Sequence, residues 1–213
     1  MRYRAASDRS LLVSFGPEIP EEISETNRLL VENLTRRLVA ARPRGILNVH
    51  PAYASVLVVF DPLTLDHRGV QHLCESTGDV PASEPRTVEI PVHYGGERGP
   101  DLADVARHTR MTPEEVVRLH SGADYVVHFL GFSPGFPYLG GLPESIATPR
   151  LSSPRVRVPA GSVAIGGGQT GVYPADSPGG WRIIGWTPIR LFDPAADPPA
   201  LLTMGSRVRF EPA

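Results

Sequence analysis

"PRVRVPAGSVAIGGGQTGVYPADSPGGWRIIGW", residues 154–186, decides the fold of the C-terminal part of this sequence. Short β-rich runs alternate in it with turns made of glycine and proline. Residues 131–194 contain ten of the 23 prolines and 12 of the 21 glycines. Because proline at this density prevents helices of useful length, the region predicts short strands joined by structured loops. The neighbouring runs YVVHF, IRLF and SRVRFEP extend the pattern, which predicts a closed or nearly closed β-barrel.

The first 84 residues predict a small α+β domain with helices on one face of an antiparallel sheet. RSLLVSFG predicts a strand that ends at Gly16, and a four-residue apolar spacing predicts a helix from Pro20 to about Ala41. The residues with this spacing are Ile23, Leu30, Leu34 and Leu38, with Ile19 just before them. RGILNVH and ASVLVVF predict a hairpin, and LTLDHRGVQHLCEST predicts a second helix that stops at Gly78.

The turn-rich stretch GDVPASEPR, residues 78–86, predicts the boundary between two domains, 1–84 and 85–213. TVEIPVHYG then predicts a strand, and two short helices follow it. The second helix has a defined start, because Thr112 and Glu115 have the spacing of a capping box and Pro113 occupies the first helical position.

Composition excludes several classes of protein. The net charge of −2 gives no electrostatic footprint for nucleic acid or an anionic membrane. The sequence has no run of 18 apolar residues, so we expect no membrane span. The single cysteine, Cys74, precludes an internal disulfide and fits a reducing cytoplasm. All 21 basic residues are arginine, and without lysine the chain has no Schiff base and no Walker A phosphate loop.

Residues 131–135, GFSPG, match the G-x-S-x-G pattern of a nucleophile elbow. In such an elbow the residue after the serine donates its backbone N–H to the oxyanion hole, and a helix begins there. Here that residue is Pro134, which has no N–H, and Pro137 follows closely. We therefore expect Ser133 to be a turn residue whose hydroxyl caps local backbone.

Residues 166–171, GGGQTG, match the dinucleotide pattern G-x-G-x-x-G but are followed by VYPADSPGG, which does not form a helix. Nucleotide binding of the Rossmann type is therefore rejected. Two interpretations remain: tight turns with positive φ, or a backbone that a ligand approaches closely, with Gln169 offering donors and an acceptor.

His128 ends the run YVVHF at the expected barrel rim. It is either a half-buried histidine bonded to backbone or a general acid–base near neutral pH. In SPGGWRIIG, Arg182 either clamps a carboxylate or phosphate or pairs with Asp176. Metal binding is not expected, because His67, His72 and Cys74 lie on different sides of a helix.

HFLGFSPGFPYLGGLP and the segment from PRLSSPRVRV to WTPIRLFDP together resemble the family called allophanate hydrolase subunit 1, which includes the B subunit of bacterial 5-oxoprolinase and a sporulation-kinase inhibitor. The resemblance covers nearly the whole chain. It implies a cyclophilin-like, carboxyltransferase-like barrel preceded by the small α+β domain. Similar domains form part of the urea carboxylase unit.

The resemblance further implies a cytoplasmic subunit of a heteromeric, ATP-dependent 5-oxoprolinase that converts 5-oxo-L-proline to L-glutamate. Its partners would be two further 5-oxoprolinase subunits, the larger C and a third, A. The chain itself would hold no cofactor and the complex would use ATP. Two alternatives are an inhibitor of a sensor histidine kinase and part of a urea carboxylase or allophanate-type complex. A prolyl isomerase is suggested by the fold alone.

Opening a lactam requires activation of a carbonyl and protonation of the leaving nitrogen. We expect His128 to supply the proton, and Gln169 and Arg182 to fix the carbonyl or carboxylate. The residues expected to contact substrate are Gly167, Gly168, Tyr173, Gly180 and Trp181.

Residues 129–142 are rich in apolar and aromatic side chains, and four glycines and two prolines prevent a regular element that would bury them all. We expect part of this loop to form a partner interface, with Phe132, Phe136 and Tyr138 in contact with the partner. The alternative is that these aromatic residues plug one end of the barrel.

Overall fold

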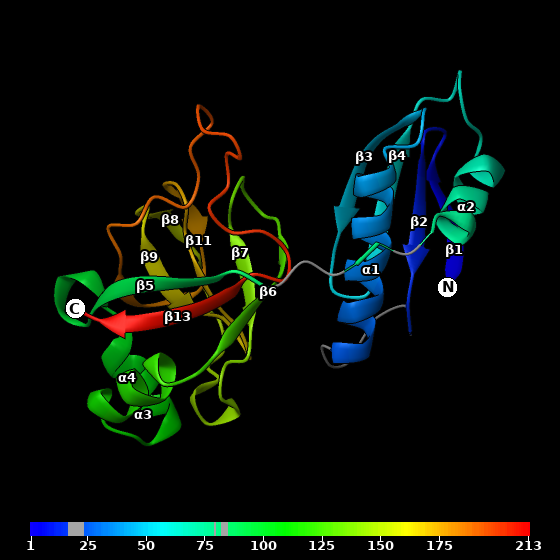
Figure 1. Ribbon diagram of the computed structural model, residues 1–213. Helices are drawn as coiled ribbons and strands as arrows, with labels where there is room; N and C mark the ends of the chain where they lie inside the picture. The colour runs from blue at the N-terminus through cyan, green and yellow to red at the C-terminus, as the bar shows by residue number, and fades with distance from the viewer. Residues whose placement is uncertain (17–23, 79, 82–84) are drawn as a thin grey trace. The chain divides into compact units, whose positions relative to one another are not determined.

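Figure 1 shows the computed structural model of the chain, which describes residues 1–16, 24–78, 80–81 and 85–213. The chain divides into two compact units, Met1–Glu84 and Pro85–Ala213. None of the described helices is both long and apolar enough to cross a membrane.

The first unit is a four-stranded antiparallel sheet in the order β1-β2-β4-β3, with two helices packed against it (Figure 1). The strands are β1 (Arg2–Ser7), β2 (Ser10–Ser14), β3 (Ile46–Pro51) and β4 (Ser55–Phe60). The helices are α1 (Glu25–Ala41) and α2 (His67–Ser76). Strand β1 was not predicted from the sequence. The helices contact each other as well as the sheet, which places them on the same face.

Helix α1 begins after Ser24, whose side chain accepts a hydrogen bond from the backbone N–H of Asn27. The predicted start at Pro20 lies outside the described residues. The buried residues of α1 are Arg28, Val31, Leu34 and Leu38. The prediction for Leu30 was wrong: its side chain is 45% exposed, and Val31 is buried in its place. The buried positions are spaced by three, three and four residues, which fits a helix of 3.6 residues per turn better than a constant spacing of four.

The second unit is built on a closed seven-stranded barrel in the order β10-β7-β6-β13-β5-β12-β9, which confirms the predicted barrel. Its strands are β5 (Thr87–Tyr94), β6 (Tyr125–Leu130), β7 (Pro137–Gly140), β9 (Ser162–Ile165), β10 (Thr170–Val172), β12 (Arg182–Trp186) and β13 (Arg207–Pro212). A separate two-stranded sheet pairs β8 (Arg155–Val158) with β11 (Ser177–Gly179). The run IRLF is not a strand: only Phe192 forms an isolated bridge, to Ala200.

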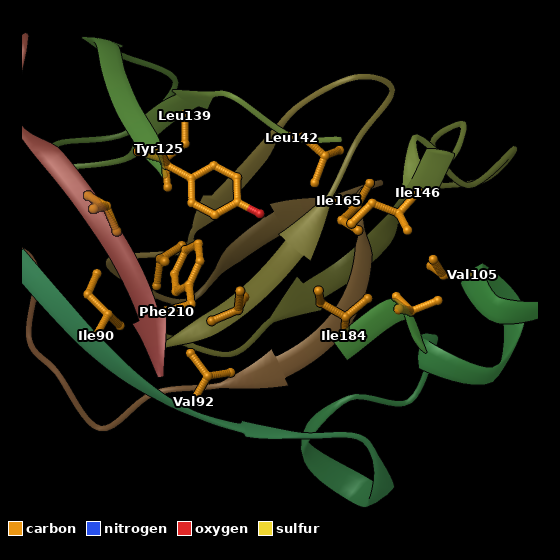
Figure 2. Close-up of a cluster of buried hydrophobic side chains, with 14 of the residues drawn as sticks. Ile90, Val92, Val105, Tyr125, Leu139, Leu142, Ile146, Ile165, Ile184 and Phe210 are labelled. Carbon is orange, nitrogen blue, oxygen red and sulfur yellow. The ribbon is translucent and has the colours of Figure 1, made fainter. Parts of the chain in front are cut away.

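Short helices complete the second unit: η1 (Gly96–Arg98), α3 (Leu102–Thr109), α4 (Pro113–Ser121) and η2 (Glu144–Ile146). The predicted capping box of α4 is confirmed, since Thr112 and Glu115 exchange both hydrogen bonds. Helices α3 and α4 contribute Val105 and Val116 to the barrel core. Figure 2 shows how Tyr125, Phe210 and the surrounding aliphatic side chains fill this core. Because these side chains fill it, the interior is a packed core.

His120, at the end of α4, ties the helix to the barrel interior through a buried hydrogen-bonded network. Its Nε2 lies 2.9 Å from Thr170 Oγ1 and its Nδ1 lies 2.8 Å from Tyr94 Oη. Thr170 donates its one hydroxyl proton to the Ala164 carbonyl, so it must accept from His120 Nε2–H. Tyr94 therefore donates to Nδ1. His120 is neutral, and its complete burial lowers its pKa to about 3.

We predict that acidification weakens the barrel through His120. The unfolded chain binds a proton there below a pKa of about 6.5, whereas the folded chain does not until about pH 3, so stability falls as the pH decreases through this interval. Protonation at His120 should lower the free energy of unfolding by up to about 1.4 kcal/mol for each pH unit. It is measured by urea unfolding between about pH 7 and 5, followed by fluorescence of Trp181 and Trp186, and the slope should flatten in His120→Gln. An equal slope in both proteins would contradict the assignment.

Candidate functional site

The loop between β6 and β7 consists of two successive turns. Ser133 N–H donates to the Gly131 carbonyl at 2.8 Å, which makes a γ-turn centred on Phe132 with φ of +66°. Phe136 N–H then donates to the Ser133 carbonyl at 3.0 Å. In this second turn Pro134 occupies position i+1 and Gly135, with φ of +80°, occupies i+2, which is the type II pattern. Pro134 and Gly135 thereby fix the shape of the second turn.

No helix follows Ser133, because β7 begins at Pro137, and the rejection of a nucleophile elbow is confirmed. The expected role of the hydroxyl was wrong in detail. Ser133 Oγ is buried and has no hydrogen-bond partner among the residues that the structure describes, so it caps no local backbone. The turns are instead formed by backbone bonds alone.

Beside this loop lies an aromatic pocket of about 80 Å³. Its lining residues are Phe132, Phe136, Tyr138, Arg150, Tyr173, Gly179, Gly180 and Trp181. Phe136 is central: its ring meets Tyr138, Tyr173 and Trp181 edge-on at centroid distances of 5.1, 5.1 and 5.5 Å. Phe132 joins them at 5.5 Å from Phe136. Edge-to-face contacts of this kind stabilise a cluster beyond its burial of apolar surface.

The pocket unites residues that sequence reasoning assigned to two different roles. Tyr173, Gly180 and Trp181 were expected to contact substrate, and Phe132, Phe136 and Tyr138 a partner; all six line it. Their exposure differs sharply. Phe136 is 2% exposed and Phe132 is 62% exposed. Phe136 is therefore a core residue, and the prediction that it contacts a partner directly was wrong. Its ring packs inward, as in the alternative in which the aromatic residues plug one end of the barrel.

Glycines near the pocket make room for aromatic rings. A Cβ on Gly179 would overlap the Tyr173 hydroxyl, and one on Gly166 would lie 2.5 Å from the Trp181 ring. Gly167 and Gly168 differ, since a Cβ on either would meet no atom within 4 Å. Gly167 has φ of +67° and forms a β-bridge with Thr148. Neither lines the aromatic pocket.

His128 and Gln169 are both buried, with exposures of 8% and 7%, and neither lines the aromatic pocket. His128 lies at an irregularity in the β6–β7 pairing, between the pairs Val127–Leu139 and Phe129–Tyr138. Its imidazole packs directly on Gly140, where a Cβ would overlap it. Gln169 lies in the short turn between β9 and β10, and the motif GGGQTG runs into strand β10 instead of a helix, which confirms the rejection of a dinucleotide fingerprint.

Arg182 does not pair with Asp176, so that alternative was wrong. Its Nη1 lies 3.4 Å from Asp104 of α3, and its Nε donates to the Pro149 carbonyl at 3.3 Å. Asp176 pairs with Arg157 instead. Arg182 thus lies in a shallow depression with Arg107 and His108, apart from the aromatic pocket.

Arg150 is a pocket residue that sequence reasoning missed, because nothing in its local pattern distinguishes it from other surface arginines. Its guanidinium carbon lies 5.7 Å from the centroid of the Trp181 ring. Burial raises the pKa of Tyr138 and of Tyr173, and the positive charge of Arg150 opposes the rise at both. Within the described residues no cluster of three or more side chains is arranged to hold a metal ion.

Comparison with known proteins places these residues in a family. A model described as carboxyltransferase domain, subdomain C and D, matches residues 1–202. The chain is 42% identical to the B subunit of 5-oxoprolinase from Bacillus subtilis, covering 95% of this chain and 89% of that protein. It is 46% identical to the Escherichia coli O157:H7 protein of the same name, covering 92% and 90%.

Solved structures share the fold. The crystal structure of TTHA0988 superimposes with a TM-score of 0.86 at 39% identity over 97% of this chain. This chain spans 40% of that longer chain. The Kluyveromyces lactis urea carboxylase has the same fold, with a TM-score of 0.74 at 21% identity over 99% of this chain and 21% of that chain.

We predict that Phe136 and Phe132 differ in their effect on stability. Phe136→Ala should lower the free energy of unfolding by about 3–5 kcal/mol, because it leaves a cavity at the centre of the aromatic cluster. Phe132→Ala removes an exposed ring and should change it by less than about 1 kcal/mol. Urea unfolding followed by tryptophan fluorescence measures both, since both tryptophans belong to the barrel unit. Equal losses in the two variants would contradict the packing described.

Proposed function

This chain belongs to the family of carboxyltransferase domains, subdomain C and D, and from that membership we propose that it is the B subunit of a heteromeric, ATP-dependent 5-oxoprolinase. The observation that carries the proposal is the identity of 42–46% to proteins named as the B subunit of 5-oxoprolinase, spread over nearly the full length of each. In the proposed reaction water opens the lactam ring of 5-oxo-L-proline to give L-glutamate, and ATP hydrolysis drives it.

The proposed partners are two further subunits, the larger C and a third, A. The absence of lysine and of a phosphate loop from this sequence favours an ATP site elsewhere in the complex. We accordingly propose that the isolated chain is inactive and completes its site on assembly.

His128, Gln169 and Arg182 remain the proposed catalytic residues of the complex, with His128 donating a proton to the leaving nitrogen. Burial of His128 and Gln169 supports a role for polar groups whose orientation is fixed before substrate arrives. Arg182 is held by Asp104 and the Pro149 carbonyl, which suits a positioning role. Gly167 and Gly168, with open space where a side chain would project, are proposed to let substrate approach the backbone.

Phe132 is the residue of the aromatic pocket best suited to contact a partner subunit. Its left-handed backbone is unfavourable for a bulky side chain by about 1–3 kcal/mol. Its ring is 62% exposed, so burial in the isolated chain recovers little of that energy. The two successive turns hold the ring in one place, which lowers the entropy lost on association.

Reconstitution tests the proposed function. We expect the chain mixed with its two partner subunits to release L-glutamate from 5-oxo-L-proline only in the presence of ATP. Omission of this chain should abolish the release, and this chain alone should give none. A mixture of the two partners that reaches the full rate without this chain would refute the proposal, as would a complete complex that hydrolyses ATP but forms no glutamate.

Phe132→Ala should weaken, by about 1–3 kcal/mol, association with the large subunit; this is the range of an aromatic interface anchor. Titration calorimetry of the two purified subunits measures it. The matched control is Val156→Ala, a 91% exposed apolar residue outside the pocket. Unchanged affinity in Phe132→Ala, or an equal loss in the control, would exclude this face of the loop as the interface.

A further inference from the structure

A second cavity, of about 240 Å³, lies in the barrel unit, and no residue lines both this cavity and the aromatic pocket. It is formed where η1, β8, β9 and β12 meet. The residues that decide its chemistry are Glu97, Arg98, Arg155, Arg157, Ile183 and Trp186. Three of its four charged lining residues are therefore arginines.

Arg155 is held in place by a buried carboxylate that is only partly available to it. Its Nη2 donates to Asp101 Oδ1 at 2.6 Å. The other oxygen, Asp101 Oδ2, accepts the backbone N–H of Ile183 at 2.7 Å. Arg155 Nη1 is buried and has no hydrogen-bond partner among the described residues. The Asp101 carboxylate therefore balances the charge of Arg155 but uses only one of its N–H donors, so the guanidinium keeps hydrogen-bonding capacity.

Arg157, two residues further along β8, pairs with a more exposed carboxylate, since its side chain is 77% exposed and that of Asp176 is 44% exposed. Its Nε donates to Asp176 Oδ2 at 2.8 Å, while Asp176 Oδ1 accepts the backbone N–H of Ala160 at 2.8 Å. These contacts hold the Asp176 carboxyl pKa below its usual range, the Ala160 N–H first and Arg157 second. Asp176 itself does not line the cavity.

Arg98 carries a charge that no carboxylate pairs with in the described part of the chain. Its guanidinium carbon lies 3.9 Å from the centroid of the Trp186 ring. The ring is itself fixed, because its Nε1–H donates to the Ala160 carbonyl at 2.8 Å and His93 stacks on it at 6.2 Å. Stacking leaves the N–H groups at the edge of the guanidinium free to donate in the plane of the group.

We propose that this cavity binds a compact oxyanion, the carboxylate or phosphate group of a small molecule. Arginine forks match both groups in geometry and charge. Arg155 is held by the buried Asp101 and Arg98 by the fixed Trp186 ring before any ligand arrives, so their ordering on binding costs little side-chain entropy. The negative charge of Glu97 repels highly charged anions and thereby restricts the site to anions of low charge. Ile183 and Trp186 offer an apolar wall to the rest of the ligand.

Titration calorimetry of the full-length chain at constant ionic strength tests the site with four probes: inorganic phosphate, ATP, acetate and 5-oxo-L-proline. Each titration is run at two temperatures, because the heat of binding can be zero at one temperature and binding would then escape detection. Saturable binding of inorganic phosphate and ATP identifies a phosphate site. Saturable binding of acetate and 5-oxo-L-proline identifies a carboxylate site. If none of the four binds saturably, the proposal is overturned. No partner subunit is present, so that failure leaves the proposed 5-oxoprolinase function untouched.

Two variants locate the binding. Arg98→Gln removes one charge, and Arg155→Lys keeps the charge beside Asp101 but loses the second nitrogen. Each should weaken binding at least about tenfold, equivalent to about 1.4 kcal/mol. The matched control is Arg190→Gln, an exposed arginine outside the cavity, and it should bind as the wild type does. Equal weakening in the control, or full affinity in both cavity variants, would overturn the assignment.

Trp186 supplies a second readout at the site. The chain has two tryptophans, so Trp181→Phe leaves Trp186 as the single indole reporter. Its fluorescence should change along the same binding curve as the calorimetric heat. Binding that leaves this fluorescence unchanged in Trp181→Phe, and is unaffected by Arg98→Gln, would place the anion elsewhere on the molecule.

Discussion

β5 and β13 pair in parallel along the whole of β13, from Arg207 opposite Thr87 to Pro212 opposite Val92. This pairing joins the first and last strands of the second unit and closes the barrel, whose other seams are shorter: β12 meets β5 at two residue pairs, and β13 meets β6 at two. Closure leaves the barrel without an open edge, and the backbone groups of its strands find partners within the sheet. The strands β9 and β10 are only four and three residues long, and in the closed sheet each of them is paired on both sides.

A closed, filled barrel directs function to its loops and rim. Its interior is occupied by Tyr125, Phe210 and the aliphatic side chains around them, and the fully buried His120 has both ring nitrogens hydrogen-bonded. The polar and aromatic residues with solvent access lie outside this core. The loop of residues 131–136 shows what the scaffold supports, since a rigid frame tolerates the strained backbone of Phe132.

Local sequence chemistry predicted those parts of the fold that local chemistry controls. Proline and glycine density predicted the barrel, and the Thr112–Glu115 capping box predicted the start of α4. Local sequence patterns did not predict contacts between residues that are distant in the sequence. Nothing in the sequence near Arg155 indicates that Asp101, more than fifty residues earlier, would hold it, and the inward direction of Phe136 depends on Tyr173 and Trp181. Arg150 was missed for the same reason, because its neighbour Trp181 is distant in sequence.

The small sheet of β8 and β11 connects the two candidate sites mechanically. Arg155 of β8 lines the arginine-rich cavity, and its ladder partner Gly179 of β11 lines the aromatic pocket. Gly179 accommodates the Tyr173 ring, while Arg155 is anchored through Asp101 to β12. A change in the position of either strand therefore alters both sites together. Backbone pairing of β8 with β11 therefore helps to set the spacing between the aromatic pocket and the arginine-rich cavity, and sites built on strands are positioned more precisely than sites on loops.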